Sequence, residues 1–357
     1  MRQPAHGGNL AWAAALASCS PDAILDFSAS ISPLGPPNSA IAAIHSQIGN
    51  LRHYPDPNYS ELRLALSHFH QLPPEWILPG NGSAELLTLI GRELAELAAT
   101  ILITPAFGDY YRTLAAYKAK VLESPLSLVT GHWSLFLDTG QKTKDKGLLL
   151  NNPHNPTGKL FSRDSILPYL EQFALVVVDE AFMDFVPPNE EQSLVSVVQE
   201  YANLVVLRSL TKFYSLPGLR LGYAIAHPDF LAKWQLWRDP WPVNTLAAAA
   251  AIAALQDTEF QQQTWAWLPP ARNQLFQGLA EIPGLQPQAS AANFLLVESQ
   301  QSTSQLQQQL LVHHQILIRD CLSFKELGDR FFRVAVRSQS DNQRLLTALG
   351  SVLSAEC

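Results

Sequence analysis

The chain has 357 residues, of which 47% are hydrophobic and 15% charged, a composition typical of a soluble globular protein with about two domains. Its formal net charge of -7, from 24 basic and 31 acidic residues, argues against a broad nucleic-acid interface, which needs clustered Lys and Arg. The three cysteines, Cys19, Cys321 and Cys357, lie too far apart for a disulfide framework or a metal site. We therefore expect a cytoplasmic protein that binds a small molecule and no metal.

The first 35 residues are rich in Gly, Pro, Ser and Asn, which predicts an arm that lies over another surface. Leu16–Cys19 resembles the end of a lipoprotein signal, but the polar His6–Asn9 stands where the apolar part of such a signal would begin. A first helix is therefore the better prediction. The longest unbroken apolar run, residues 246–255, has about half the length that a membrane-spanning helix needs.

Short apolar runs alternate with helix-length stretches from about residue 75 to 226. The runs are residues 76–78, 101–103, 147–150, 175–178 and 204–207. This alternation predicts a largely parallel sheet with helices on both faces, which binds its ligand at the carboxyl ends of the strands. Polar clusters follow the runs at these ends, at residues 80–83, 104–105, 151–158, 179–180 and 208–212.

A Pro-Trp-Pro break at residues 240–242 separates this region from an Ala-rich helix and a second pattern of strands. The second set of strands is expected at residues 294–297, 316–318 and 331–336. This pattern predicts a smaller α/β domain.

A lysine, two hydroxyl residues and an arginine stand close together near the end of the first region. Lys212 follows Ser209 by three residues and Thr211 by one, and Arg220 comes eight residues later. Partial burial would lower the pKa of the Lys212 amine and make it a nucleophile toward a carbonyl carbon. The hydroxyls and the guanidinium are groups that together bind a phosphate. Taken alone, Lys212 is better explained as a solvated loop lysine, but its neighbours favour a covalent anchor beside a phosphate site.

With this spacing, S-x-[ST]-K followed by the Arg, the sequence resembles the fold-type I pyridoxal-phosphate enzymes, in their class I/II aminotransferase branch. The resemblance implies an α/β fold with a mostly parallel seven-stranded sheet in a large domain, a smaller α/β C-terminal domain, and pyridoxal 5'-phosphate as cofactor. It divides the chain into an arm at 1–45 that packs on the small domain and on a partner subunit, a large domain at 46–242 and a small domain at 243–357. Ser209, Thr211, Lys212 and Arg220 are then cofactor ligands, with Lys212 catalytic.

Further family motifs follow in the expected order. Asp179, at the end of an apolar run, is implied to pair with the pyridine nitrogen as a second catalytic residue, because a carboxylate there keeps the nitrogen protonated. Asn155 is implied to bond the phenolic oxygen of the cofactor, and Phe107 to stack on its ring. A helix that begins at Gly82, Ser83 and Ala84 is implied to hold the cofactor phosphate with its first N–H groups. Read singly, these residues also fit a helix cap, a turn or a packed core.

The resemblance also implies a shared active site. Tyr54 matches a tyrosine that reaches the cofactor phosphate of the neighbouring subunit, which predicts a homodimer. Arg337 matches the arginine that binds the substrate α-carboxylate. Arg333 would face the same side of an extended strand and is a second candidate.

Two activities within the family compete for this sequence. Many aminotransferases of this branch have Tyr where this chain has Phe182, which removes one donor to the phenolic oxygen. Five segments resemble decarboxylases of a phosphorylated amino acid, at residues 6–9, 26–35, 179–185, 240–244 and 316–321. The alternatives are an aminotransferase of a phosphorylated amine and, from another class, a non-catalytic cofactor-binding regulator. Either enzyme needs a second anion site, for which the candidates are Arg319, His6 and Ser30, with Asn155 also near the substrate.

Overall fold

The computed structural model describes residues 7–127 and 143–354. At its centre lies a seven-stranded sheet in the order β2-β8-β7-β6-β5-β3-β4. Its strands are β2 (Ile77–Asn81), β3 (Ala99–Thr104), β4 (Val121–Pro125), β5 (Lys146–Asn151), β6 (Leu175–Asp179), β7 (Leu204–Ser209) and β8 (Leu221–Ala226). β8 pairs antiparallel with β2 and β7, and the other pairs are parallel. The predicted mostly parallel seven-stranded sheet is confirmed.

The sheet is buried because successive side chains of its strands enter two different cores. Val176 and Val178 of β6 belong to one hydrophobic cluster, whereas Val177 between them belongs to the other. Each fully buried valine of this kind contributes roughly 1.5 to 3 kcal/mol relative to an exposed one. One face is covered by α4 (Gly82–Ala95), α5 (Gly108–Ala116) and α7 (Pro228–Gln235), and α6 (Arg163–Leu170) lies on the other.

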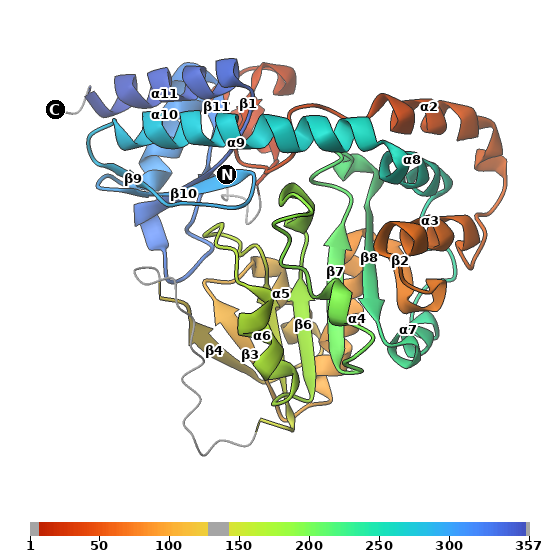
Figure 1. Cartoon of the computed structure of the whole chain (residues 1–357). Helices are drawn as coiled ribbons and strands as arrows, with labels where there is room; N and C mark the ends of the chain where they lie inside the picture. The colour runs from red at the N-terminus through yellow and green to blue at the C-terminus, as the bar shows by residue number, and fades with distance from the viewer. Residues whose placement is uncertain (1–6, 128–142, 355–357) are drawn as a thin grey trace.

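A group of helices extends this second layer. α2 (Asn38–Gln47) and α3 (Ser60–His70) pack against α8 (Thr245–Gln256). α9 (Thr258–Ala280) then runs from beside α8 to the part of the molecule that holds β9 and β10 (Figure 1). α8 and α9 each begin at a side-chain cap. Asn244 accepts from the N–H of Ala247 at the start of α8, and Asp257 accepts from the N–H of Phe260 at the start of α9. These caps satisfy N–H groups that the first turn of a helix leaves unpaired.

The C-terminal part contains a second sheet in the order β12-β13-β10-β9. Its strands are β9 (Leu285–Pro287), β10 (Phe294–Ser299), β12 (Arg319–Asp320) and β13 (Phe331–Ala335), flanked by α10 (Thr303–His314) and α11 (Gln339–Ser354). The pairs are antiparallel. Residues 316–317 do not join this sheet: they form β11, which pairs with β1 (Leu25–Asp26) from the N-terminal region.

The N-terminal region lies on this smaller part. α1 (Leu10–Ala17) contacts α10, and β1 pairs with β11. Residue 45 falls inside α2, so the end of an arm at 45 does not coincide with a loop. The division of the chain at 242/243 stays a prediction. Across the described ranges, 7–127 and 143–354, no helix has the length and hydropathy needed to cross a membrane.

Candidate active site

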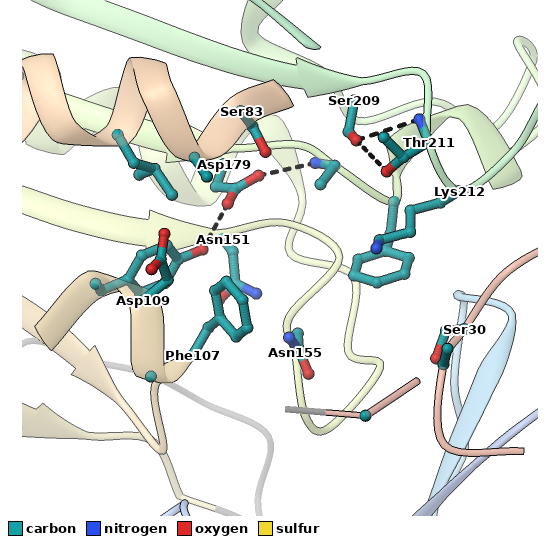
Figure 2. A pocket seen from close by; sticks show the side chains of 18 of the residues that line it. Ser30, Ser83, Phe107, Asp109, Asn151, Asn155, Asp179, Ser209, Thr211 and Lys212 are labelled. Atoms are coloured by element: carbon teal, nitrogen blue, oxygen red, sulfur yellow. Dashed lines mark hydrogen bonds between the residues drawn. The ribbon is translucent and has the colours of Figure 1, made fainter. Parts of the chain in front are cut away.

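A cavity of about 370 Å³ lies where β3, β5, β6 and β7 end and the smaller sheet covers them. Parallel strands bring their carboxyl ends to one edge of the sheet, which is why motifs far apart in the sequence meet here. Most of the cofactor residues expected from the sequence line the cavity: Ser83, Ala84, Phe107, Asn155, Asp179, Ser209, Thr211, Lys212 and Arg220. In Figure 2, Ser209, Thr211 and Lys212 lie on one side of this space, with the amine of Lys212 pointing into it, and Asp179 and Phe107 lie on the other side.

Asp179, the last residue of β6, is 6% exposed. Its Oδ2 accepts a hydrogen bond from the hydroxyl of Tyr110 at 2.8 Å, and its Oδ1 accepts from the N–H of Ala181 at 3.0 Å. Burial raises the pKa of the carboxyl group, while these two donors and the nearby Lys212 oppose that shift. The carboxylate would therefore be stabilised further by a cationic N–H inside the cavity.

Lys212 follows β7 and its amine faces the cavity. Burial and the positive charges of Arg333 and Arg220 lower the pKa of this amine, and the charge of Asp179 opposes them. Together they bring the pKa to about 8. An amine with this pKa is partly unprotonated at neutral pH and is a competent nucleophile. The expectation from the sequence that burial lowers the pKa is supported.

The residues expected from the sequence to bind a phosphate gather around the start of α4. Gly82 begins this helix at a φ of +71°, and a Cβ on it would lie 2.5 Å from Nη2 of Arg220. Glycine therefore allows the guanidinium to lie against the helix N-terminus, which attracts anions. The hydroxyls of Ser209 and Thr211 are 2.7 Å apart and complete a polar pocket. Gly82 shapes this pocket without lining the cavity itself.

On the face of the sheet away from the cavity, a buried cluster of charged side chains links the ends of β6 and β7. Glu180 and Arg208, next in sequence to Asp179 and Ser209, point to the other side of the sheet. Oε2 of Glu180 accepts from Nη1 of Arg208 at 3.3 Å, and Arg208 also pairs with Asp184. Burial raises the pKa of Glu180 to about 7. This cluster fixes the strand ends from which the two predicted catalytic residues emerge.

Two arginines from the smaller sheet face the cavity together. Arg319 on β12 is paired directly opposite Arg333 on β13, so both side chains lie on the same face of the sheet. Nη2 of Arg319 donates to Oγ of Ser323 at 2.6 Å, and Nη1 of Arg333 donates to Oδ1 of Asn155. Both arginines are less than a tenth exposed. Two neighbouring buried guanidinium groups form a site for anions.

Arg337, the first choice from the sequence for the carboxylate clamp, does not line the cavity, and this part of the prediction is wrong. β13 ends at Ala335, so the alternation that would align residues 333 and 337 stops two residues too early. The guanidinium of Arg337 instead donates to Asp341 at 3.2 Å and to the carbonyl oxygen of Asp26 at 3.2 Å. The second candidate, Arg333, occupies the expected place.

The three other expected residues, Ser30, Tyr54 and His6, lie in different places. Ser30 is 3% exposed and lines the cavity, and its Oγ has no hydrogen-bond partner within the described part of the chain. Tyr54 lies outside the cavity, is 79% exposed and stacks on Trp241 at 4.5 Å between ring centroids. His6 lies outside the described residues, although its neighbour Gly7 lines the cavity.

Sequence reasoning missed Tyr110. It lies three residues after Phe107, on the first turn of α5, which brings it to Asp179. The spacing of three residues between Phe107 and Tyr110, one turn of a helix, could have predicted that both side chains face the same side. Phe182, noted for its missing hydroxyl, lines the cavity and packs edge-on against Phe294 with ring centroids 5.0 Å apart.

Residues 22–349 match the family described as aminotransferase class I and II. The chain belongs to this family, whose cofactor is pyridoxal 5'-phosphate. It is 40% identical, over 98% of its length, to threonine-phosphate decarboxylase of Salmonella typhimurium, of which 97% is covered. It is also 30% identical, over 99% of its length, to an adenosylcobalamin biosynthesis bifunctional protein of Leptospira interrogans, of which 41% is covered.

A similar solved structure is histidinol-phosphate aminotransferase from Clostridium acetobutylicum. It matches with a TM-score of 0.86 at 30% identity, covering 93% of this chain and 100% of that one. The fold expected from the sequence is thus confirmed. The residues present also fit the cofactor. A buried carboxylate held by a tyrosine hydroxyl and a backbone N–H, a lysine of lowered pKa and a hydroxyl-lined helix N-terminus beside Arg220 surround one cavity.

Proposed function

We propose that this chain decarboxylates L-threonine O-3-phosphate to (R)-1-amino-2-propanol O-phosphate and CO₂ with pyridoxal phosphate, as a step of cobalamin biosynthesis. The observation that carries the proposal is the pair Arg319 and Arg333, which face Lys212 and Asp179 across one cavity. A substrate with a carboxylate and a phosphate monoester needs two such cationic groups. The similarity to the Salmonella decarboxylase over nearly the whole chain supports the same reaction.

The residues that would hold the cofactor follow from the geometry of the cavity. Ser83, Ser209, Thr211, Arg220 and the first N–H groups of α4 would hold its phosphate, and Asp179 would pair with its ring nitrogen. Phe107 would pack on the ring, and the amide Nδ2 of Asn155 would donate to the phenolic oxygen. The bound cofactor supplies an electron sink for the pair left at the α-carbon.

The chain's own residues select the bond that breaks. Arg333 binds the α-carboxylate and Arg319 binds the phosphate, with the hydroxyl of Ser30 beside them, so the Cα–carboxylate bond is held in the orientation for cleavage. CO₂ leaves, and the α-carbon takes a proton in its place. Lys212 Nζ, whose pKa is about 8, is the group that holds this proton.

The deciding experiment incubates the purified holoenzyme separately with threonine phosphate alone and with histidinol phosphate plus 2-oxoglutarate. We expect CO₂ and aminopropanol phosphate from the first mixture, and no glutamate from the second. Glutamate formation without CO₂ release would overturn the proposal in favour of the aminotransferase.

Histidinol-phosphate aminotransferase is the second candidate function. The similarity to the Clostridium structure favours it, and its substrate also carries a phosphate. Phe182 argues against it, because many aminotransferases of this branch have a tyrosine hydroxyl at that place. A regulator without catalysis fits less well, since Lys212 and Asp179 line the same cavity.

The two arginines on and beyond β13 give a matched pair of variants. Arg333→Gln is expected to lower kcat/KM for threonine phosphate by about 10- to 150-fold, the equivalent of one charge-assisted contact of about 1.5 to 3 kcal/mol. Arg337→Gln is expected to change kcat/KM by less than about 3-fold, because it removes only an ion pair and a backbone contact away from the cavity. Initial rates of CO₂ release measure both. A larger loss for Arg337→Gln than for Arg333→Gln would restore Arg337 as the clamp.

We further propose that the active unit is a homodimer in which Tyr54 contacts the cofactor phosphate of the partner subunit. The exposed, stacked Tyr54 and Trp241 support an interface at this surface. Heterodimers of a Tyr54→Ala chain and a Lys212→Ala chain should regain activity, because one of their two sites then contains both native residues. Verified heterodimers with no more activity than the parent variants would contradict shared sites.

A further inference from the structure

In the turn after β1, the carboxylate of Asp26 bonds to Ser28, and Ser28 in turn bonds to the N-terminal arm. Oδ1 of Asp26 accepts from the backbone N–H of Ser28 at 2.7 Å and from its hydroxyl at 2.6 Å. The same Ser28 hydroxyl accepts from the N–H of Gly8 at 2.8 Å. Because the hydroxyl donates to Asp26, its lone pairs point toward the arm. The carboxylate thus orients the group that holds Gly8.

The arm packs very closely at this point. A Cβ on Gly7 would lie 2.3 Å from the carbonyl oxygen of Ser28, so only glycine allows this approach. Gly7, Ser28 and Ser30 all line the cavity. The backbone of the arm is therefore part of the cavity wall, and Ser28 is its anchor.

Ser28 also accepts a hydrogen bond from Arg333, the arginine assigned to the substrate carboxylate. Nη2 of Arg333 donates to the carbonyl oxygen of Ser28 at 3.4 Å, and Nε of Arg333 has no hydrogen-bond partner among the residues that the structure describes. Burial lowers the pKa of Arg333 to about 10, and the negative charge of Asp26 opposes that shift. Asp26 therefore acts on both the arm and the arginine without lining the cavity itself.

We propose that Asp26 is a positioning residue that, through Ser28, holds the Gly7–Gly8 backbone and the Arg333 guanidinium at the anion-binding end of the cavity. It thereby sets how tightly the cavity binds the substrate through the arginine assigned to the α-carboxylate. This inference rests on the proposed function. We expect Asp26 to affect substrate binding and not cofactor binding, because the groups around the cofactor phosphate belong to other segments of the chain.

Kinetics of the holoenzyme test the positioning role. Asp26→Ala and Ser28→Ala should each raise KM for threonine phosphate about 10-fold or more while changing kcat less than about 3-fold, since one charge-assisted contact is lost at the binding end. KM for threonine, which carries the same α-carboxylate, should rise by a similar factor. Asp26→Asn keeps an acceptor at Oδ1 and should recover most of the wild-type KM. Asp22→Ala, at an exposed neighbouring position, is the matched control and should leave KM unchanged.

Gly7→Ala separates the arm from the carboxylate, because it displaces the arm while Asp26 and Ser28 remain. It should give the same rise in KM, and the double variant Gly7→Ala/Asp26→Ala should be little worse than either single variant. A loss of kcat with KM unchanged, or fully additive effects, would overturn the positioning role.

Hydrogen exchange gives a readout that does not depend on the reaction. In the holoenzyme without substrate, the amide of Gly8 should exchange faster in Ser28→Ala and Asp26→Ala than in wild type, and unchanged in Asp22→Ala. Unchanged exchange in the first two variants would refute the anchor. If the wild-type enzyme releases no CO₂ from threonine phosphate, the proposed function fails, while the exchange result still decides the anchor on its own.

Discussion

Replacing Lys212 by Ala is expected to lower turnover by at least about 10³-fold, the equivalent of about 4 kcal/mol in the barrier, because the only amine shown to line the cavity is removed. The purified wild-type protein should be yellow, and borohydride should fix the cofactor on Lys212. Lys120→Ala, at an exposed position, is the control and should keep full activity. A lysine adduct that borohydride still fixes in Lys212→Ala would disprove the assignment.

The pKa of Lys212 adds a pH dependence to this result. With a folded pKa of about 8, roughly a tenth of the amine is unprotonated at pH 7. The rate at which the cofactor-free protein captures pyridoxal phosphate should therefore rise about tenfold per pH unit below 8 and level off above it. N-acetyl-lysine methylamide, with an ordinary amine, should show a rate that continues to rise beyond pH 9. A protein rate that follows the free amine would contradict the lowered pKa.

The same shift has a consequence for stability. Because the folded pKa of Lys212 lies below that of the unfolded chain, the unfolded state binds more protons between about pH 8 and 10.5. Titration of Lys212 therefore increases the free energy of unfolding of the cofactor-free protein as pH rises through this window. In Lys212→Met, this part of the pH dependence should be absent from denaturant-unfolding curves.

The second large effect is expected from Asp179→Asn. This change keeps the shape of the side chain but removes the charge that keeps the ring nitrogen protonated, so turnover should fall by about 100-fold or more, the equivalent of about 3 kcal/mol or more. Cofactor occupancy, measured by absorbance, should stay near normal because the phosphate ligands are untouched. An Asp179→Asn enzyme with wild-type kcat would refute this role.

Tyr110→Phe serves as the companion variant. It leaves the Asp179 charge in place and removes only the donor at 2.8 Å, so its effect on kcat should stay below about 10-fold. A loss as large as that of Asp179→Asn would mean that orientation of the carboxylate, rather than its charge, limits the reaction.

The sequence by itself determined the central sheet and the cofactor half of the site. Strand ends carry their polar residues to one edge because of the chain's local alternation of strands and helices, and this needs no knowledge of distant contacts. The polar clusters that contain Asp179, Asn155 and Lys212 could therefore be placed at this edge, and the family resemblance then implied the roles of these residues. The apolar runs did not include β4, a largely exposed edge strand, or β8, which is fully buried and pairs antiparallel between β2 and β7.

Only the tertiary structure decided the substrate half. Which arginine faces the cavity depends on where β13 ends and on its pairing with β12, and neither register nor strand end is encoded by local periodicity. Arg333 therefore lies in the cavity, and Arg337 lies outside it. The contacts of Ser28 with Gly8 and Arg333 likewise join segments up to 305 residues apart in the sequence, and only packing of the arm on the smaller sheet brings them together.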